Sequence, residues 1–161
     1  MNYNKIFVTF FGAGLSPIAP GTMGSIAAFL VAIPLFFCSH LPILLGVISL
    51  AILLPAGTIC SNIYSKKTQQ SDPKEIVVDE VCGYFLSLAI SLPATTQNFQ
   101  HYMMILLVNL AFFRFFDIYK PRPISWIDEN MKNGFGVMLD DVVAGIFSGC
   151  VSISVIELLL R

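Results

Sequence analysis

Residues 41–64 constrain the fold of this chain most, because they form a long apolar run without a single charged residue. A helix needs about 20 predominantly apolar residues to cross the hydrocarbon core of a bilayer, and this run exceeds that length. Residues 142–160 also reach it, with Glu157 near their end. The chain is therefore expected to be embedded in a membrane.

Three further apolar stretches, residues 25–38, 76–92 and 102–116, fall short of that length. Some of them are expected to be tilted, re-entrant or partly interfacial. Backbone groups in lipid must be hydrogen-bonded internally, which favours helices for all five stretches. Pro34, Pro42 and Pro55 predict kinks or helix ends.

The composition agrees with a membrane protein. Hydrophobic residues make up 56% of the chain and charged residues only 12%, against about 25% charged in typical soluble domains. We predict an all-α protein, a polytopic membrane helical bundle of four to five apolar helices, with residues 1–161 forming a single membrane-embedded domain. The net charge of -1 gives no indication of nucleic-acid binding.

The charged residues are concentrated in two segments. Residues 66–80 and 114–141 hold 16 of the 19 Lys, Arg, Asp and Glu residues, whereas the connections at residues 39–41 and 93–101 hold none. If the apolar stretches cross or dip and return, the charged segments share one membrane face. The positive-inside rule makes that face cytoplasmic, on the count of Lys66, Lys67, Lys74, Lys120, Arg122 and Lys132.

Two carboxylate pairs, Asp79–Glu80 and Asp140–Asp141, each stand where an apolar helix is expected to begin. On a helix, Asp79 points about 100° away from Glu80. Acidic residues at a helix start also favour the macrodipole without any further role. Two such pairs on one membrane side nevertheless resemble a divalent-ion site, and oxygen ligands without nearby His or Cys favour Mg²⁺ over zinc.

Small residues follow each pair. Gly83 lies beyond Asp79–Glu80, and Gly145 and Gly149 form a GxxxG face beyond Asp140–Asp141. Such faces allow helices to pack closely. The face at Gly145 and Gly149 would also permit a helix dimer, and the sequence leaves the oligomeric state open.

A third cluster ends the fourth apolar stretch. Arg114 and Asp117 are i, i+3 neighbours, and Lys120 and Arg122 follow among prolines. One interpretation is a metal-binding aspartate followed by cations for phosphate. The other is a belt of snorkelling cations at the interface, and residue types alone leave the two about even.

A glycine- and proline-rich segment, residues 12–25, precedes the first apolar stretch. Thr22 or Ser25 could cap the helix that follows, and a helix N-terminus suits a phosphate group. A simple turn leading into a membrane helix explains the same spacing, since the segment is neither a P-loop nor a GxGxxG motif.

The sequence lacks the motifs of several phosphatase classes, namely those that use a histidine, cysteine or aspartate nucleophile. His40 and His101 lie on or beside the charge-free connections, no cysteine is followed six residues later by arginine, and no DxDxT-like run occurs. Metal-assisted hydrolysis of a phosphate ester remains. A small membrane transporter or divalent-ion-binding protein that uses the same carboxylates is the alternative.

Four blocks, in order along the chain, resemble the phosphatidylglycerophosphatase A family. Residues 113–126 (FRFFDIYKPRPISW) and 136–145 (GVMLDDVVAG) look like its signature runs, and residues 16–24 (SPIAPGTMG) and 79–83 (DEVCG) are similar to its other two blocks. The resemblance implies a Mg²⁺-dependent hydrolase of the bacterial inner membrane. Together with the apolar stretches and the positive-inside rule, it predicts a multi-pass protein with its active site on the cytoplasmic face. Its expected reaction, in phospholipid metabolism, converts phosphatidylglycerol phosphate to phosphatidylglycerol and inorganic phosphate.

The resemblance also implies roles for individual residues. The expected metal ligands are Asp79, Glu80, Asp140 and Asp141. Asp117, Asp79 and Asp141 are the expected catalytic residues, with Asp117 either joining the ligands or acting as general base. The phosphate contacts that the resemblance implies are Lys120 and Arg122. We expect Arg114 and the loop residues Gly21, Thr22 and Ser25 to contact the phosphate as well.

Overall fold

A computed structural model describes residues 3–38, 40–92 and 98–159 of the chain. Within these residues the protein is all-α and contains no strand, as predicted. The elements in chain order are α1 (Tyr3–Val8), η1 (Ala13–Leu15), α2 (Pro20–Ala32), η2 (Ile33–Phe37), α3 (Leu41–Val47), η3 (Ile48–Leu53), α4 (Leu54–Thr68), α5 (Val78–Ser91), α6 (Phe99–Tyr119), α7 (Ile124–Asn130) and α8 (Gly134–Leu159).

Four helical segments are long and apolar enough to cross a membrane: Pro20–Phe37, Leu41–Thr68, Phe99–Tyr119 and Gly134–Leu159. The expectation that the first and fourth apolar stretches are too short is therefore wrong. Each helix extends into flanking polar or glycine-rich sequence; α6, for example, starts beyond Asn98, whose side chain accepts a hydrogen bond from the Gln100 N–H at 2.8 Å. These segments expose much apolar surface, and only 17% of the residues in the most apolar window of Leu41–Thr68 are buried.

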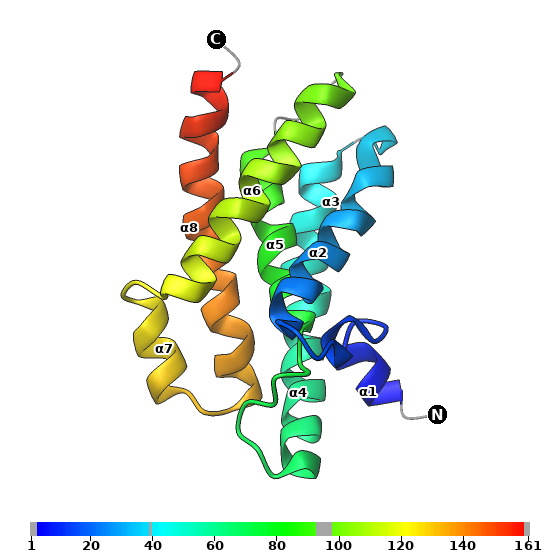
Figure 1. Cartoon of the computed structure of the whole chain (residues 1–161), viewed down its shortest axis with the longest axis vertical. Coiled ribbons are helices and arrows are strands. Elements are labelled where there is room, and N and C mark those ends of the chain that lie inside the picture. The colour runs from blue at the N-terminus through cyan, green and yellow to red at the C-terminus, as the bar shows by residue number, and fades with distance from the viewer. Residues whose placement is uncertain (1–2, 39, 93–97, 160–161) are drawn as a thin grey trace.

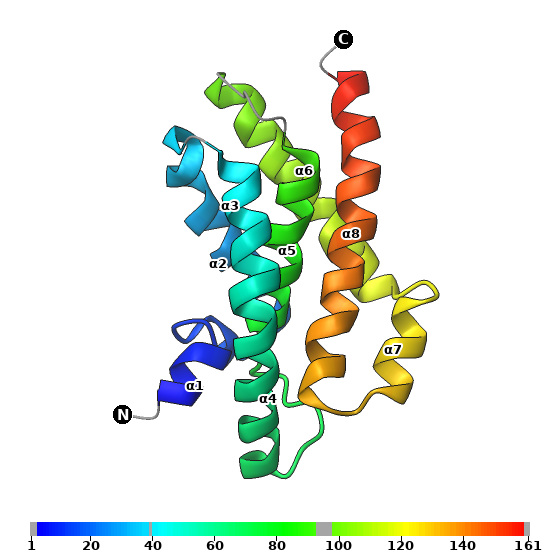
Figure 2. The same ribbon diagram turned by 180° about the vertical axis from the view of Figure 1, so that it is seen from behind.

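The third apolar stretch forms α5, which is 14 residues long and too short to span a bilayer. Figure 2 shows α5 in the middle of the bundle, between α3 and α8, and it also packs against α2 and α6. Most of its side chains are buried. Because protein rather than lipid surrounds α5, charged residues at its start need not face hydrocarbon.

The prolines interrupt regular helix without breaking the spans. Pro34 lies in the 3-10 turn η2, and Pro42 in the first turn of α3. Pro55 lies in the first turn of α4, directly after the π-helical segment η3. Proline cannot donate a backbone hydrogen bond, so the helix type changes locally beside these prolines. The segments α3, η3 and α4 nevertheless continue as one helical segment.

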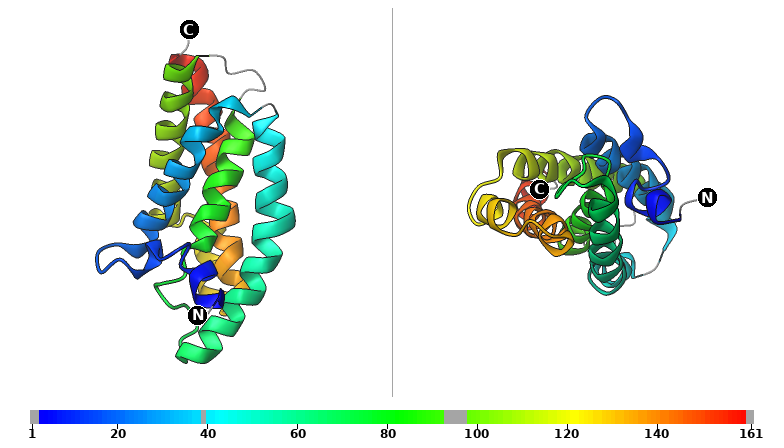
Figure 3. Two further views of the ribbon diagram at one scale, coloured as in Figure 1. Left: turned by 90° about the vertical axis from the view of Figure 1, so that its right-hand side faces the viewer. Right: turned by 90° about the horizontal axis from the view of Figure 1, so that it is seen from below.

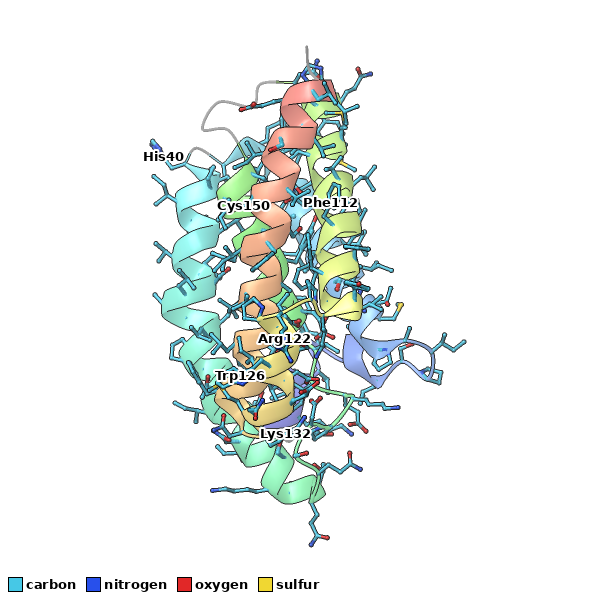
Figure 4. All side chains as sticks on the ribbon, turned by 90° about the vertical axis from the view of Figure 1, so that its left-hand side faces the viewer. His40, Phe112, Arg122, Trp126, Lys132 and Cys150 are labelled. Carbon is cyan, nitrogen blue, oxygen red and sulfur yellow. The ribbon has the colours of Figure 1, made fainter. Side chains whose placement is uncertain are left out.

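The charged segments lie at one end of the bundle, as predicted. The end of α4, the start of α5, the end of α6, α7 and the start of α8 meet there (Figure 1). Figure 4 shows His40 at the opposite end from Arg122 and Lys132. Residue 39 and residues 93–97 of the charge-free connections lie outside the described part of the chain.

Helices α5 and α8 make the most extensive contact in the bundle. A Cβ on Gly83 would overlap the Asp141 carbonyl group, one on Gly145 would overlap the Gly83 carbonyl group, and one on Gly149 would lie 2.8 Å from Ile90 Cβ. The close helix packing predicted for these glycines is thus found within the chain. The suggestion of a helix dimer through Gly145 and Gly149 is not supported, because α5 already covers that face.

Candidate active site

A cavity of about 190 Å³ opens at the charged end of the bundle. Its walls come from the start of α2, the loop before α5, the start of α5, the end of α6 and the second turn of α8. The lining residues are Pro20, Gly21, Asp72, Pro73, Lys74, Ile76, Asp79, Glu80, Asp117, Lys120, Val137, Asp140 and Asp141.

Asp79, Glu80 and Asp141 form the inner part of the cavity. One carboxylate oxygen from each lies within 4.8 Å of the others. Asp79 and Asp141 are buried, and Glu80 Oε2 is buried without a hydrogen-bond partner. The different directions of Asp79 and Glu80 along α5 do not separate them, because Asp141 approaches from α8 within reach of both.

The glycine contact explains this approach. Gly83 lies one turn beyond Asp79–Glu80, and Gly145 lies one turn beyond Asp141. The two helices meet backbone to backbone at these glycines. The carboxylates one turn away, on α5 and on α8, are therefore brought close together across the α5–α8 interface. Close packing of small residues therefore positions the acidic cluster.

The second carboxylate pair lies deeper in its helix than predicted. Helix α8 begins at Gly134, not at Asp140, because Asn62 Oδ1 and Asn133 Oδ1 accept hydrogen bonds from the N–H groups of Gly134 and Gly136 at 2.7 and 2.9 Å. A helix N-terminus leaves such N–H groups unpaired, and these side chains satisfy them six residues earlier than expected.

Asp140 and Lys120 form an ion pair at the cavity wall. Lys120 Nζ donates to Asp140 Oδ2 at 2.7 Å and lies 3.1 Å from Asp128 Oδ1. Burial lowers the pKa of Lys120, but these two carboxylates outweigh it and raise the pKa above its usual value. Lys120 is therefore a cation at neutral pH, and it is part of the cavity wall.

Arg114 acts behind the cavity rather than in its wall. Its Nη1 pairs with Asp117 Oδ2 and donates to Ser25 Oγ at 3.3 Å. Ser25 Oγ in turn donates to the Gly21 carbonyl at 3.1 Å. Arg114 thus orients Asp117, which lines the cavity, and joins α6 to α2.

The start of α2 lies directly against the acidic cluster. A Cβ on Gly21 would overlap Glu80 Oε1, so a larger residue there would displace that carboxylate. The predicted caps are wrong: Pro20 opens α2 after Ala19, and no side chain caps it. Neither Thr22 nor Ser25 lines the cavity.

One other site prediction differs from the structure, and two residues of the cavity wall were not predicted. Arg122 is exposed and does not line the cavity, and Figure 4 shows it near α7. Asp72 and Lys74 do line it, although neither is among the predicted site residues. Nothing in the sequence distinguishes these two from other loop charges, because only the fold carries their loop back over the start of α5.

The charge balance fits a hard divalent cation. Six carboxylates line the cavity against two lysines, and carboxylates this close repel one another. A cation among Asp79, Glu80 and Asp141 would relieve that repulsion and give Glu80 Oε2 a partner. All-oxygen ligation is typical of Mg²⁺ and Ca²⁺ rather than of zinc.

Comparison with known proteins agrees with these features. The family model of phosphatidylglycerophosphatase A matches residues 6–156. Phosphatidylglycerophosphatase A of Escherichia coli is 40% identical over 144 residues, covering 86% of this chain and 74% of that protein; its namesake from Haemophilus influenzae is 38% identical over 138 residues, covering 86% and 79%.

A third relative, from Bacteroides thetaiotaomicron, is named provisionally as a phosphatidylinositol-3-phosphatase and is 37% identical over 141 residues, covering 87% of this chain and 85% of that protein. No solved structure matches the chain. The family model and the relatives, each covering most of the sequence, show that this chain belongs to the phosphatidylglycerophosphatase A family.

Proposed function

We propose that this protein is a Mg²⁺-dependent phosphatidylglycerophosphatase, which hydrolyses phosphatidylglycerol phosphate to phosphatidylglycerol and inorganic phosphate. The observation that carries the proposal is the cluster of Asp79, Glu80 and Asp141 in a cavity that also contains a lysine ammonium group. Family membership supplies the substrate class, and the cluster supplies a site able to neutralise a phosphate group.

Asp79, Glu80 and Asp141 would hold the Mg²⁺ ion, with Asp140 beside them. When bound, the ion supplies charge neutralisation at the phosphate and polarises its oxygens. The cavity fits this role because its acidic lining is otherwise unbalanced and Glu80 Oε2 has no partner.

The protein's own groups account for binding and proton transfer. Lys120 contacts the phosphate oxygens from the end of α6. Asp117, held by Arg114, accepts a proton from the water whose oxygen attacks phosphorus. The bond between phosphorus and the glycerol oxygen breaks, and that oxygen takes a proton from solvent, leaving an alcohol and inorganic phosphate.

We further propose that the charged end faces the cytoplasm of a bacterium, with the bundle in the inner membrane. The lysines of residues 66–80 and 114–141 support this orientation through the positive-inside rule. The alternative of a transporter is not favoured, because the cavity lies at one end of the bundle. The deeper polar side chains of Ser87, Ser91, Asn109 and Ser148 bond to one another instead of lining a path; Ser87 Oγ, for example, donates to Asn109 Oδ1 at 2.6 Å.

Phosphate release by detergent-purified protein from phosphatidylglycerol phosphate, with Mg²⁺ and with EDTA, tests the proposal. Release that requires Mg²⁺ is expected. Phosphatidylinositol 3-phosphate and phosphatidic acid serve as competing substrates. No release from folded protein under any condition, or faster release from one of the other lipids, would contradict the proposed reaction or its substrate.

A further inference from the structure

The cavity is too small for a whole phospholipid. At about 190 Å³ it lies below the roughly 300–1,000 Å³ of pockets that enclose drug-sized ligands. If the protein hydrolyses a lipid phosphate, as proposed above, only the head group enters and the acyl chains stay outside. The bundle must then offer a route between the cavity and the bilayer.

Two walls of the cavity come from helices that face lipid. Pro20 and Gly21 belong to the start of α2, and Asp117 and Lys120 to the end of α6. One turn deeper, the hydrogen bond from Arg114 to Ser25 joins these helices. A head group that enters between α2 and α6 is therefore stopped at the level of the carboxylates.

Exposed apolar side chains lie beside both of these walls. Ile18, two residues before Pro20, is 78% exposed, and Ile118, next to Asp117, is 70% exposed. Tyr119 is also exposed, and its ring stacks on Phe115. Each group adjoins a cavity wall in sequence, so the apolar surface continues to the cavity.

The segment before α2, residues 9–19, is here called the apolar loop. It contains no charged residue, although it lies at the end of the bundle that holds most of the charges. Phe11, Leu15 and Ile18 are exposed on it. Figures 3 and 4 show the loop projecting from the same side of the bundle as α2 and α6.

The backbone of the apolar loop suits an environment poor in water. Every non-proline N–H from Thr9 to Ile18 donates a hydrogen bond within residues 5–18; Phe11, for example, donates to the Ile6 carbonyl at 2.9 Å, and the Ile18 N–H donates to Ser16 Oγ at 3.4 Å. Irregular backbone in water need not be paired in this way, whereas unpaired groups are costly near hydrocarbon.

The apolar loop is also tied to the catalytic end. Gly14 packs so closely on the Glu75 carbonyl that a Cβ would overlap it, and the Val77 N–H donates to the Val8 carbonyl at 2.8 Å. Glu75 and Val77 directly precede the start of α5. The loop is therefore held in a fixed position relative to the carboxylates, with Phe10 packed against the core and the side chains of Phe11, Leu15 and Ile18 exposed.

We propose that the apolar loop lies in the head-group region of the bilayer and forms, with Phe115, Ile118 and Tyr119 of α6, the rim of a lateral portal between α2 and α6. The diacylglycerol part of the substrate rests against this rim while its phosphate enters the cavity. The occupant is bilayer lipid, because the rim lies at the ends of two membrane-spanning segments and lacks charge.

Fluorescence quenching tests the position of the rim without requiring activity. Trp126 is the chain's one tryptophan, so Trp126→Phe provides a silent background for Ile18→Trp and Ile118→Trp. Lipids brominated near the head group should quench both probes in liposomes. Gln70→Trp, in the exposed charged loop, is the matched control and should be quenched by iodide instead. Rim probes that behave like Gln70→Trp would overturn the proposal.

A kinetic comparison tests the route. The KM for substrate in a bilayer is expressed here as the mole fraction of substrate at the surface. Ile18→Asp and Ile118→Asp should each raise this KM about tenfold, whereas Ile18→Leu and Ile118→Leu should leave it unchanged. Unchanged KM in both aspartate variants would overturn the portal. If the unaltered protein releases no phosphate, the proposed reaction fails, and quenching still decides whether the loop contacts lipid.

Discussion

Gly83 on α5 and Gly145 on α8 meet backbone to backbone, so that a Cβ on Gly145 would overlap the Gly83 carbonyl group. This contact lies one turn from Asp79–Glu80 on one helix and from Asp141 on the other. The spacing of the acidic cluster therefore depends on two residues without side chains.

Gly83→Ala should force the two helices apart. Its Cβ would collide with the Asp141 carbonyl and crowd the Phe113 ring, which we expect to destabilise the protein by about 1–3 kcal/mol and to lower phosphatase activity. Gly46→Ala is the matched control, because its Cβ would make an ordinary contact of 3.6 Å with Ala89. Unfolding in detergent and phosphate release check both variants, and equal behaviour of the two would contradict this role of Gly83.

Asp141→Asn should abolish turnover while the fold persists. Removing one charge from three crowded carboxylates relieves repulsion, so thermal stability should be unchanged or higher. Activity should fall by at least about 10³-fold, the order expected when a key group that stabilises transition-state charge is removed. Asp128→Asn, at the outer partner of Lys120, should lose far less. Near-normal activity of Asp141→Asn would exclude the carboxylate cluster as the site.

Mg²⁺ should stabilise the protein through the same carboxylates. A ligand present at 100 times its Kd adds about 2.7 kcal/mol to the stability of the folded state, which raises Tm in a thermal scan. Glu80→Gln should weaken this increase, because Glu80 Oε2 is the buried oxygen that lacks a partner. An equal Mg²⁺-induced shift in both proteins would show that the ion binds elsewhere.

Lys120→Met should weaken substrate binding, since it removes the lysine at the end of α6 that reaches the cavity. We expect KM to rise about tenfold or more, the loss of one charge-assisted hydrogen bond, with Lys120→Arg intermediate. Steady-state kinetics on mixed micelles measure the effect. Arg122→Met is the control, because Arg122 is exposed outside the cavity; a larger loss in that variant would reverse the assignment.

A buried polar network deep in the bundle should matter for stability. The hydroxyls of Ser87 and Ser91 both donate to Asn109 Oδ1, at 2.6 and 2.9 Å. Asn109→Leu removes that acceptor and should cost about 1–2 kcal/mol, the upper range for hydrogen bonds between membrane helices. Leu107→Ala, on the exposed face of the same helix, should cost less, and unfolding in detergent compares the two.

The sequence by itself determined the helical class, the membrane location, the gathering of charges at one end and five of the six carboxylates that line the cavity. These follow from local properties: an uncharged apolar run such as residues 41–64 has few alternatives to a membrane helix, and carboxylates in apolar surroundings stand out wherever the helix runs. Composition and spacing are enough for both conclusions.

Only the tertiary structure decided how these parts meet. Four features depend on contacts between segments distant in the chain. They are the burial of α5 inside the bundle, the ion pair of Lys120 with Asp140, the position of Arg114 behind Asp117 and the position of Asp72 in the cavity wall. Those contacts follow from the shape of packed helix faces, above all from the close approach at Gly83 and Gly145. A one-dimensional pattern does not record which faces meet, so these relationships became visible only in the fold.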